Sequence, residues 1–345
     1  MKKIISFLIL LSFLTACAAP TQTAVIQNIE LPTATVEFTP IPTFTAEPTI
    51  QPTQDFPTFT PPTASLAQSN AIQFKANGTY ADIIDSIPAG SSKTYVVNAT
   101  KGQVMSISIL PQIPDGGWGY IPMQIKGADG SILCPQSVES ECMFWRGTLP
   151  ASQDYFVTLT PNGDVPQFTM RVAINPPGKD VQYFSYGNSA TGLSLTYSDE
   201  FAPALPVVGN YKTDPELTLH FIDSKTYEKT NLSEAYLFIS STSDAQTVAT
   251  CTELNQNGGG GPEYPVGDEI INGFTFTHST SEGAGAGNYY QQEIHRTVNQ
   301  NICYEVIYYI HSTNVGNYTP GTVTEFDREG ILKKMAAIFS TLTLK

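Results

Sequence analysis

The stretch Val104-Met105-Ser106-Ile107-Ser108-Ile109 alternates large apolar side chains with small polar ones. Successive side chains of a β-strand point to opposite faces of a sheet, so a period of two residues is typical of a strand. Met105, Ile107 and Ile109 therefore share one face, while Val104 and the two serines share the other. The pattern predicts a half-buried strand whose methionine and isoleucines face a hydrophobic core.

Residues 71–175 around this strand contain further short runs of strand type. Turn signals such as Ala128-Asp129-Gly130 and Pro161-Asn162-Gly163-Asp164 lie between the runs. Several short strands at this spacing, without helical periodicity, are typical of an antiparallel β-sandwich. The other expected strands are residues 94–99, 123–126, 155–160 and 168–174.

Three segments of this region resemble bacterial pre-peptidase C-terminal (PPC) β-sandwich domains. Residues 87–95 (IPAGSSKTY) and 98–103 (NATKGQ) resemble the opening of such a domain, and residues 148–155 (TLPASQDY) resemble its second half. The resemblance implies a jelly-roll-like β-sandwich over residues 70–176. It also implies an accessory role, because such domains usually accompany secreted enzymes or adhesins.

Residues 177–345 have a different pattern, in which strands are followed by one helix. Asn272-Gly273 predicts a tight hairpin, and residues 299–301 predict a second one. Apolar residues then recur at helical spacing up to Leu342, with Thr324 as the expected N-cap and Asp327 in the first turn. The expected strands are residues 193–197, 217–222, 235–240, 274–278, 289–298 and 303–311.

An antiparallel sheet with a terminal helix defines an α+β domain over residues 177–345. Its opening, residues 192–197 (GLSLTY), and its terminal helix resemble the PsbP/Mog1-like lipoprotein domains. We therefore expect a mainly β chain with an α+β part: a jelly-roll-like β-sandwich, then an antiparallel sheet domain with a C-terminal helix.

The first residues have the pattern of a secretion signal. Lys2 and Lys3 precede an apolar run over residues 4–14, which is shorter than the roughly 20 residues that span a bilayer. Leu14-Thr15-Ala16-Cys17 resembles the lipobox of bacterial lipoproteins. This resemblance implies that residues 1–16 are removed and that lipid, including palmitate, is attached to the Cys17 thiol. An ordinary signal peptide that is cut nearby is the alternative.

Residues 17–69 form a tract rich in proline and threonine that follows the expected lipid anchor. Such a composition does not bury enough apolar surface to offset chain ordering, so we expect a disordered spacer. Prolines extend it toward polyproline II, so that it holds the later domains away from the membrane. We expect the protein on the extracytoplasmic side of the bacterial cell membrane or the outer membrane.

Five cysteines leave one unpaired residue, and lipidation accounts for Cys17. In an oxidising compartment we pair Cys134 with Cys142 and Cys251 with Cys303. Free or metal-bound thiols are the alternative. The sequence has no C-x-x-C motif and no histidine beside a cysteine, which disfavours a zinc site built on these thiols.

The charge of the chain excludes one class of partner. There are 31 acidic and 17 basic residues, and removal of Lys2 and Lys3 leaves 15 basic residues and a net charge of −16. An acidic surface repels phosphate backbones, so we expect no nucleic-acid partner. It also disfavours docking on anionic lipid headgroups by a basic patch, which leaves the lipid as the expected membrane contact.

The ionisable residues do not form a recognisable catalytic or metal motif. The four histidines lack H-E-x-x-H spacing, and we expect solvent-facing imidazoles, although strands could bring some together. A pair among Glu293, Glu305 and Asp268 would suit a glycosidase. The glycine-rich residues 283–288 precede a strand and not a helix, so a turn is favoured over a phosphate loop. The histidines are His220, His278, His295 and His311.

Aromatic residues provide the candidate ligand-binding positions. Trp118 and Tyr120 lie in a glycine-rich run, where exposed rings could stack on sugar rings. A place in the sandwich core is the alternative for Trp118 and the expectation for Trp145. Tyrosines on the later strands suit either a recognition face or a sheet core. They are Tyr289, Tyr290, Tyr304, Tyr308, Tyr309 and Tyr318.

These observations favour a lipid-anchored, non-catalytic protein over an enzyme. We expect it to present binding domains to a polysaccharide or to another exported protein. No cofactor, metal ligand or catalytic residue is predicted, and the oligomeric state is left open. An extracellular polymer hydrolase, or an accessory module of one, is the first alternative, and a structural component of the envelope is the second.

Overall fold

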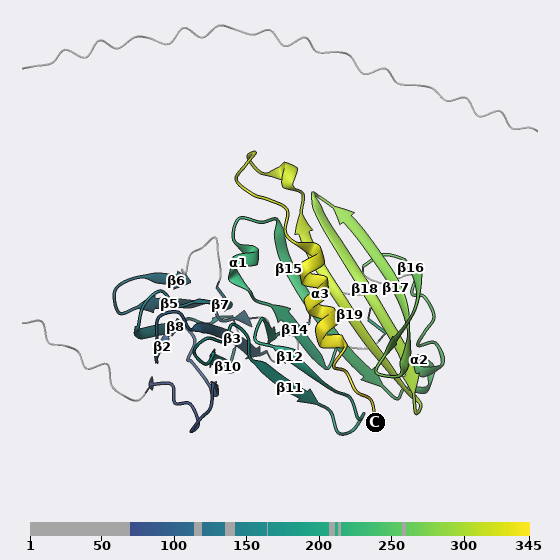
Figure 1. Cartoon of the computed structure of the whole chain (residues 1–345), viewed down its shortest axis with the longest axis horizontal. Helices are drawn as coiled ribbons and strands as arrows, with labels where there is room; N and C mark the ends of the chain where they lie inside the picture. Colours follow the sequence, from purple (N-terminus) through teal and green to yellow (C-terminus); the bar gives the residue numbers. More distant parts are fainter. Residues whose placement is uncertain are drawn as a thin grey trace, which may run out of the picture. The chain divides into compact units, whose positions relative to one another are not determined.

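The computed structural model describes residues 70–113, 119–134, 142–163, 165–206, 211–212, 215–256 and 260–345. These residues belong to one compact unit, residues 64–345. Cys17, the proline-rich tract and Trp118 lie outside the described residues. The described part is mainly β, with antiparallel sheets and a C-terminal helix, as the sequence predicts (Figure 1).

The first part of the described chain consists of two four-stranded antiparallel sheets that share one core. One sheet has the order β1-β10-β3-β7, and the other has the order β2-β8-β5-β6. The short strands β4 (Gly119–Tyr120) and β9 (Asn162–Gly163) pair with each other. The sheet strands are β1 (Tyr80–Asp85), β2 (Lys93–Ala99), β3 (Val104–Gln112), β5 (Met123–Gly127), β6 (Ile132–Cys134), β7 (Phe144–Thr148), β8 (Gln153–Leu159) and β10 (Gln167–Ile174).

Strand β3 corrects one expectation, because it is buried on both faces. Met105, Ile107 and Ile109 lie in the sandwich core as predicted, but the serines on the other face are buried as well. The neighbouring strand β7 carries Arg146 on that outer face, opposite Ser106. The Arg146 guanidinium contacts carboxylates from the later part of the chain, and packing of that part covers the face. The alternation of residues within one strand does not show that a segment far along the chain will pack on its outer face.

The second part is built on a seven-stranded antiparallel sheet of order β13-β14-β15-β19-β18-β17-β16. A separate hairpin, β11 (Tyr183–Gly187) with β12 (Ser194–Ser198), precedes it. The short helices are α1 (Ser224–Tyr227), α2 (Ala245–Ala249) and η2 (Val315–Asn317). The sheet strands are β13 (Phe201–Pro203), β14 (Leu217–Phe221), β15 (Leu232–Thr242), β16 (Glu263–Ile271), β17 (Phe274–Gly285), β18 (Asn288–Asn299) and β19 (Ile302–Thr313).

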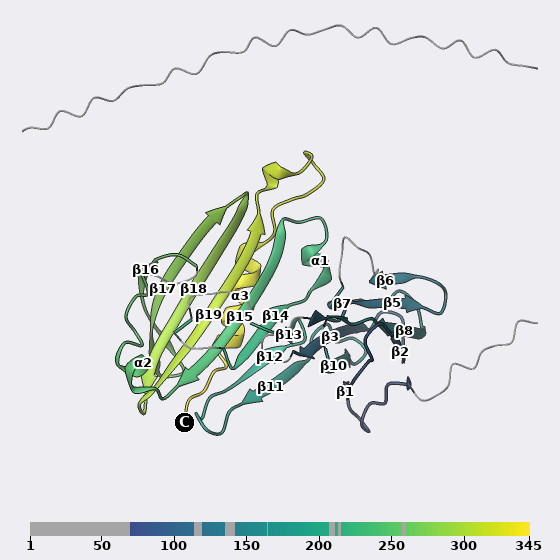
Figure 2. The same ribbon diagram turned by 180° about the vertical axis from the view of Figure 1, so that it is seen from behind.

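Helix α3 (Arg328–Phe339) lies across one face of this sheet, which we call the helix face (Figure 1). The opposite face, the back face, is in front in Figure 2. Met335 and Phe339 of the helix belong to the same core as Tyr308 of β19 and Phe276 of β17. A smaller apolar cluster lies on the back face and contains Tyr236, Phe238, Ile294, Ile307 and Tyr309.

Two-residue turns with positive φ at both positions join the last four strands of the sheet. Asn272 (φ 48°) and Gly273 (φ 86°) join β16 to β17, which confirms the predicted tight hairpin. The second predicted hairpin is also present, at Gln300 and Asn301. The glycine-rich residues form the turn between β17 and β18 and not a phosphate loop. Turns of this kind follow the right-handed twist of the strands and set their register.

The start of the terminal helix differs from the prediction, since Thr324 does not cap it. The Thr324 backbone N–H donates to the Lys229 carbonyl, which holds this residue in extended pairing. The helix begins at Arg328, and the Asp327 side chain is its N-cap, accepting from the Gly330 N–H at 2.9 Å. Both residue types suit a cap. Because Thr324 pairs with the segment around Lys229, Asp327 is the residue that caps the helix.

The structure contains the disulfides Cys134–Cys142 and Cys251–Cys303, which is the pairing expected from the sequence. The first joins the end of β6 to the residues just before β7. The second joins the segment after α2 to β19, in the middle of the seven-stranded sheet. Within the described ranges, no helix has both the length and the apolar character needed to cross a membrane.

Candidate functional site

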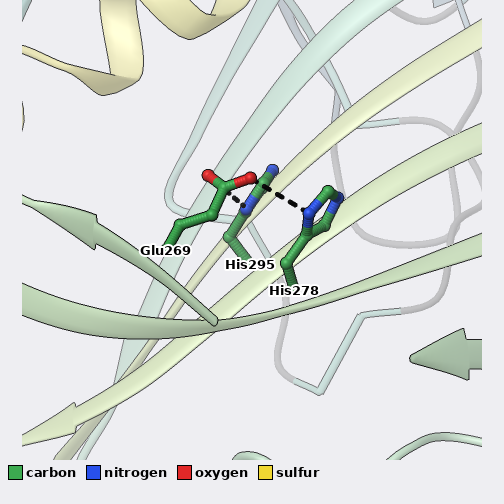
Figure 3. A group of neighbouring side chains, drawn as sticks. All are labelled: Glu269, His278 and His295. Atoms are coloured by element: carbon green, nitrogen blue, oxygen red, sulfur yellow. Dashed lines mark ion pairs between the residues drawn. The ribbon is translucent and has the colours of Figure 1, made fainter. Parts of the chain in front are cut away.

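Four ionisable side chains come together on the helix face of strands β16, β17 and β18. His278 of β17 is the direct cross-strand partner of His295 of β18. Glu293 precedes His295 by two residues and therefore shares its face. Glu269 of β16 is opposite Phe276, so it is a diagonal neighbour of His278. Figure 3 shows the Glu269 carboxylate beside both imidazoles.

The His278 imidazole lies between two carboxylates. Its Nδ1 is 3.0 Å from Glu269 Oε1, and its Nε2 is 2.9 Å from Glu293 Oε2. The hydrogen bond to Glu293 raises the pKa of His278, although burial opposes this. Burial alone would raise the pKa of Glu293, but His278 and Arg328 outweigh it and lower that pKa. Each partner therefore favours the charged form of the other.

The second imidazole, His295, has a different environment because it is only 2% exposed. Its ring stacks on His278 at 4.4 Å and contacts Phe339 of α3 at 4.9 Å between ring centroids. Burial, together with the nearby His278, lowers the pKa of His295 to about 3. Its Nδ1 is 3.6 Å from Glu269 Oε2, and among the described residues neither ring nitrogen has a hydrogen-bond partner.

An open cleft of about 740 Å³ lies between this cluster and helix α3. Arg328, at the start of the helix, donates to Glu293 Oε1 at 3.0 Å and to Gln291 Oε1 at 3.1 Å. A second cleft of about 600 Å³ also has Arg328 in its wall and extends past Tyr289 and Asn314. The helix therefore supplies a cation that lines both clefts.

A separate ionic cluster is buried on the back face of the same sheet. The Arg296 guanidinium donates to both carboxylate oxygens of Glu263, at 2.7 and 2.8 Å, and to Glu305 on the other side. All three side chains are buried. Burial raises the pKa of Glu305, while Arg296 opposes that shift. Because little of the cluster meets solvent, we assign it a structural role.

The expectation of solvent-facing histidines was wrong for His220 and His295, which are both buried. His220 stacks on Tyr236 and packs edge-on against Phe144. The convergence of His278 and His295 was detectable in principle from the turn. One lies eight residues before Ala286 and the other eight residues after Gly287, so a two-residue turn there makes them direct partners.

The carboxylates proposed as a glycosidase pair are not brought together. Glu293 is on the helix face, Glu305 is buried on the back face, and Asp268 is exposed on β16. Trp145 lies in the sandwich core as predicted. Tyr120, a candidate ligand-binding residue, is half-buried in β4, and its hydroxyl accepts a hydrogen bond from the Asn162 amide.

The tyrosines of the second part divide between core and surface. Tyr304, Tyr308 and Tyr309 are buried in β19, as expected for a central strand. Tyr289 and Tyr318 are exposed, and the Tyr289 ring belongs to the wall of the second cleft. The tyrosine content therefore reflects mainly the sheet core and only in part a surface.

Comparisons with known proteins assign no family. No family model matches the chain, and no curated protein matches it. Among solved structures, it resembles the periplasmic lysozyme inhibitor PliG from Aeromonas hydrophila, with 19% identity, a TM-score of 0.25, and coverage of 30% of this chain and 94% of that one. The PliG of Salmonella Typhimurium has 20% identity and a TM-score of 0.23, with coverage of 30% and 96%. A PliG mutant from Escherichia coli has 19% identity and a TM-score of 0.22, with the same coverage as the Salmonella protein.

Proposed function

We propose that this chain is a lipid-anchored extracytoplasmic protein that binds another exported protein along strand β16. The observation that carries the proposal is the exposure of three large apolar side chains on that one strand. Tyr264 and Val266 are each 59% exposed, and Ile270 is 76% exposed. Exposed apolar side chains gathered on one element are typical of protein-binding surfaces.

The position of β16 suits this role, because it is the last strand of the seven-stranded sheet. An edge strand offers backbone groups to which an extended segment of another protein can add as a further strand. The irregular register between Pro265 and Gly267 interrupts the edge and limits uncontrolled pairing. We therefore assign the backbone pairing to residues 267–271, and side-chain contacts to Ile270 within that range and to Tyr264 and Val266 before it.

Charge narrows the chemistry of the partner. The chain carries 31 acidic against 17 basic residues, and β16 presents Asp268 and the partly exposed Glu269 but no lysine or arginine, while its Glu263 is buried against Arg296. A basic, extended segment complements such an edge and is attracted to it at low ionic strength. The proposed occupant is thus a basic segment of an exported protein.

Two independent features support the proposal: a lipobox-like sequence supports lipid anchoring, and the disulfides support export. The lipobox-like residues 14–17 are where a lipoprotein would be cleaved and acylated. The two disulfides suit an oxidising compartment outside the cytoplasm. We expect metabolic labelling with palmitate to mark the wild-type chain and not Cys17→Ser. Equal labelling of both would contradict the anchor.

Site-specific cross-linking tests the partner. A photoreactive residue at position 270 of the full chain, in intact cells, should give a discrete product with one exported protein. The matched control is Ile84, which is 65% exposed on β1, another edge strand. The purified captured protein should bind wild type and Ile84→Asp alike, lose binding to Ile270→Asp, and bind less tightly as salt rises. Equal loss in both variants, or capture from both positions, would refute the assignment to β16.

A polysaccharide is the second candidate, and the cleft beside Tyr289 favours it. The exposed Tyr289 ring lies there with the side chains of Gln291 and Asn314, which suits stacking on a sugar ring with hydrogen bonds around it. Binding of envelope polysaccharide that is lost in Tyr289→Ala, but kept in Ile270→Asp, would establish this function instead.

A further inference from the structure

We propose that Glu269, His278 and His295 form a binding site for a divalent transition-metal ion, with Zn²⁺ as the best-suited ion. The site would use one oxygen of the carboxylate and one nitrogen of each imidazole. Two imidazoles and one carboxylate are a ligand set that zinc takes in proteins. This inference does not depend on the protein partner proposed above.

The donor atoms already have nearly the required spacing. His278 Nδ1 is 3.0 Å from one Glu269 oxygen, and His295 Nδ1 is 3.6 Å from the other. One ligand atom from each of the three residues lies within 4.8 Å of the other two. Zinc–ligand bonds of about 2.0–2.2 Å in a tetrahedron separate ligand atoms by about 3.3–3.6 Å. Because the two imidazole rings are stacked at 4.4 Å, they would have to tilt toward Glu269 so that both Nδ1 atoms point at one ion.

The unpaired nitrogens of His295 are an independent observation that points to a ligand. This side chain is almost fully buried, and within the described part of the chain neither nitrogen has a hydrogen-bond partner. A buried polar group without a partner costs about 1–3 kcal/mol. The rings of Tyr308 and Phe339 pack against the His295 imidazole, whose Nδ1 lies 3.6 Å from Glu269. A metal bond to Nδ1 would satisfy one of the two nitrogens.

The surroundings of His278 match the outer contacts of known metal sites. Its Nε2 contacts Glu293 at 2.9 Å, and Glu293 accepts from Arg328 at 3.0 Å. A metal-bound histidine commonly donates its other N–H to a carboxylate, which sets the ring orientation. Glu293 would play this part and leave Nδ1 of His278 facing Glu269. Glu293 is thus a positioning residue and not a ligand.

Three protein ligands leave a tetrahedral ion with one open position. The cleft of about 740 Å³ borders all three side chains, so solvent or an anionic group can reach that position. Open sites of this kind bind an exchangeable fourth ligand. The ion would also tie β16 to β17 and β18, since Glu269 lies on the edge strand. Removal of metal should therefore loosen the edge of the sheet.

Metal stoichiometry on the full-length chain tests the proposal. After treatment with EDTA and dialysis, titration with Zn²⁺ should give one bound ion per chain, and Co²⁺ should give the intense visible absorption of a tetrahedral site. The Glu269 side chain is 41% exposed, so Glu269→Gln should fold normally, yet bind zinc at least about 100-fold more weakly. His295→Ala should abolish the tetrahedral cobalt spectrum, and Glu293→Gln should weaken binding by about 10–100-fold.

The matched control is His311→Ala, a strand imidazole of the same sheet that contacts Asn288 and Glu234. It should keep the stoichiometry, the affinity and the spectrum of the wild type. Absence of zinc binding by the wild type would overturn the proposal. Binding that is unchanged in both Glu269→Gln and His295→Ala would also overturn it. Neither result affects the cross-linking test at position 270, so the two proposals fail separately.

Discussion

Arg296→Met removes the cation that holds two buried carboxylates together on the back face of the sheet. The guanidinium makes two hydrogen bonds to Glu263 and one to Glu305, and all three residues are buried. Loss of one partner from a buried ion pair costs about 3–5 kcal/mol, because the remaining charge is buried without its ion-pair partner. We expect a destabilisation in this range at pH 7, although methionine fills much of the space.

Urea denaturation with the disulfides intact measures this loss. The midpoint should fall while the m-value is unchanged, so that the shift reports free energy. In the variant, burial should raise the pKa of Glu305 further above the unfolded value, since Arg296 opposes that rise in the wild type. Stability lost through a raised folded pKa returns as pH falls, by about 1.4 kcal/mol per pH unit for each proton. The deficit should therefore be smaller at pH 5 than at pH 7.

A triple variant separates charge from packing. Glu263→Gln and Glu305→Gln in the Arg296→Met background remove the unpaired charges and keep oxygens that accept from Ser279 and from the Lys212 N–H. Replacement of a whole buried ion cluster by neutral groups is often close to neutral. The triple variant should therefore be more stable than Arg296→Met alone. A loss below about 1 kcal/mol in the single variant, or no recovery in the triple variant, would refute the reasoning.

Three further predictions concern other parts of the fold. Removal of the Cys251–Cys303 disulfide by a double serine substitution should lower the free energy of unfolding by about 4 kcal/mol, and removal of Cys134–Cys142 by about 2.5 kcal/mol. The first loss is larger because its cysteines are 52 residues apart, whereas those of the second are 8 apart. Equal losses in urea denaturation would contradict this loop-length argument. Burial lowers the pKa of His220 to about 3. Between pH 6 and pH 4, this imidazole is therefore protonated in the unfolded chain but neutral in the folded chain. The wild type should therefore lose about 1.4 kcal/mol per pH unit more than His220→Gln as pH falls, and parallel stability curves would count against this. Gly330→Ala should bring little of the usual gain of about 1 kcal/mol in helix stability, because its Cβ would lie 2.3 Å from the Asp327 carboxylate that caps α3. In an Asp327→Ala background, Gly330→Ala should give the full gain in stability. A full gain with Asp327 present would contradict the prediction, because it would show that the carboxylate can move away from the new Cβ.

The sequence determined the elements whose signals are local. Alternation over residues 104–109 identified the strand that the structure extends to Gln112, and Asn272-Gly273 specified a hairpin because both residues tolerate positive φ. The odd number of cysteines, together with an exported context, led to the same two pairs that the structure contains. These features depend on residues that are neighbours in the chain or on simple counting, so no knowledge of packing was needed.

Only the tertiary structure decided which side chains meet across strands. The backbone of Thr324 pairs with residues near position 229, and this left Asp327 to cap the helix. His278 and His295 face each other because a two-residue turn sets their register, and a shift of one residue would place them on opposite faces. Glu269 joins them from a third strand. The candidate metal site thus arises from register and sheet order, which depend on contacts between residues that are far apart in the sequence.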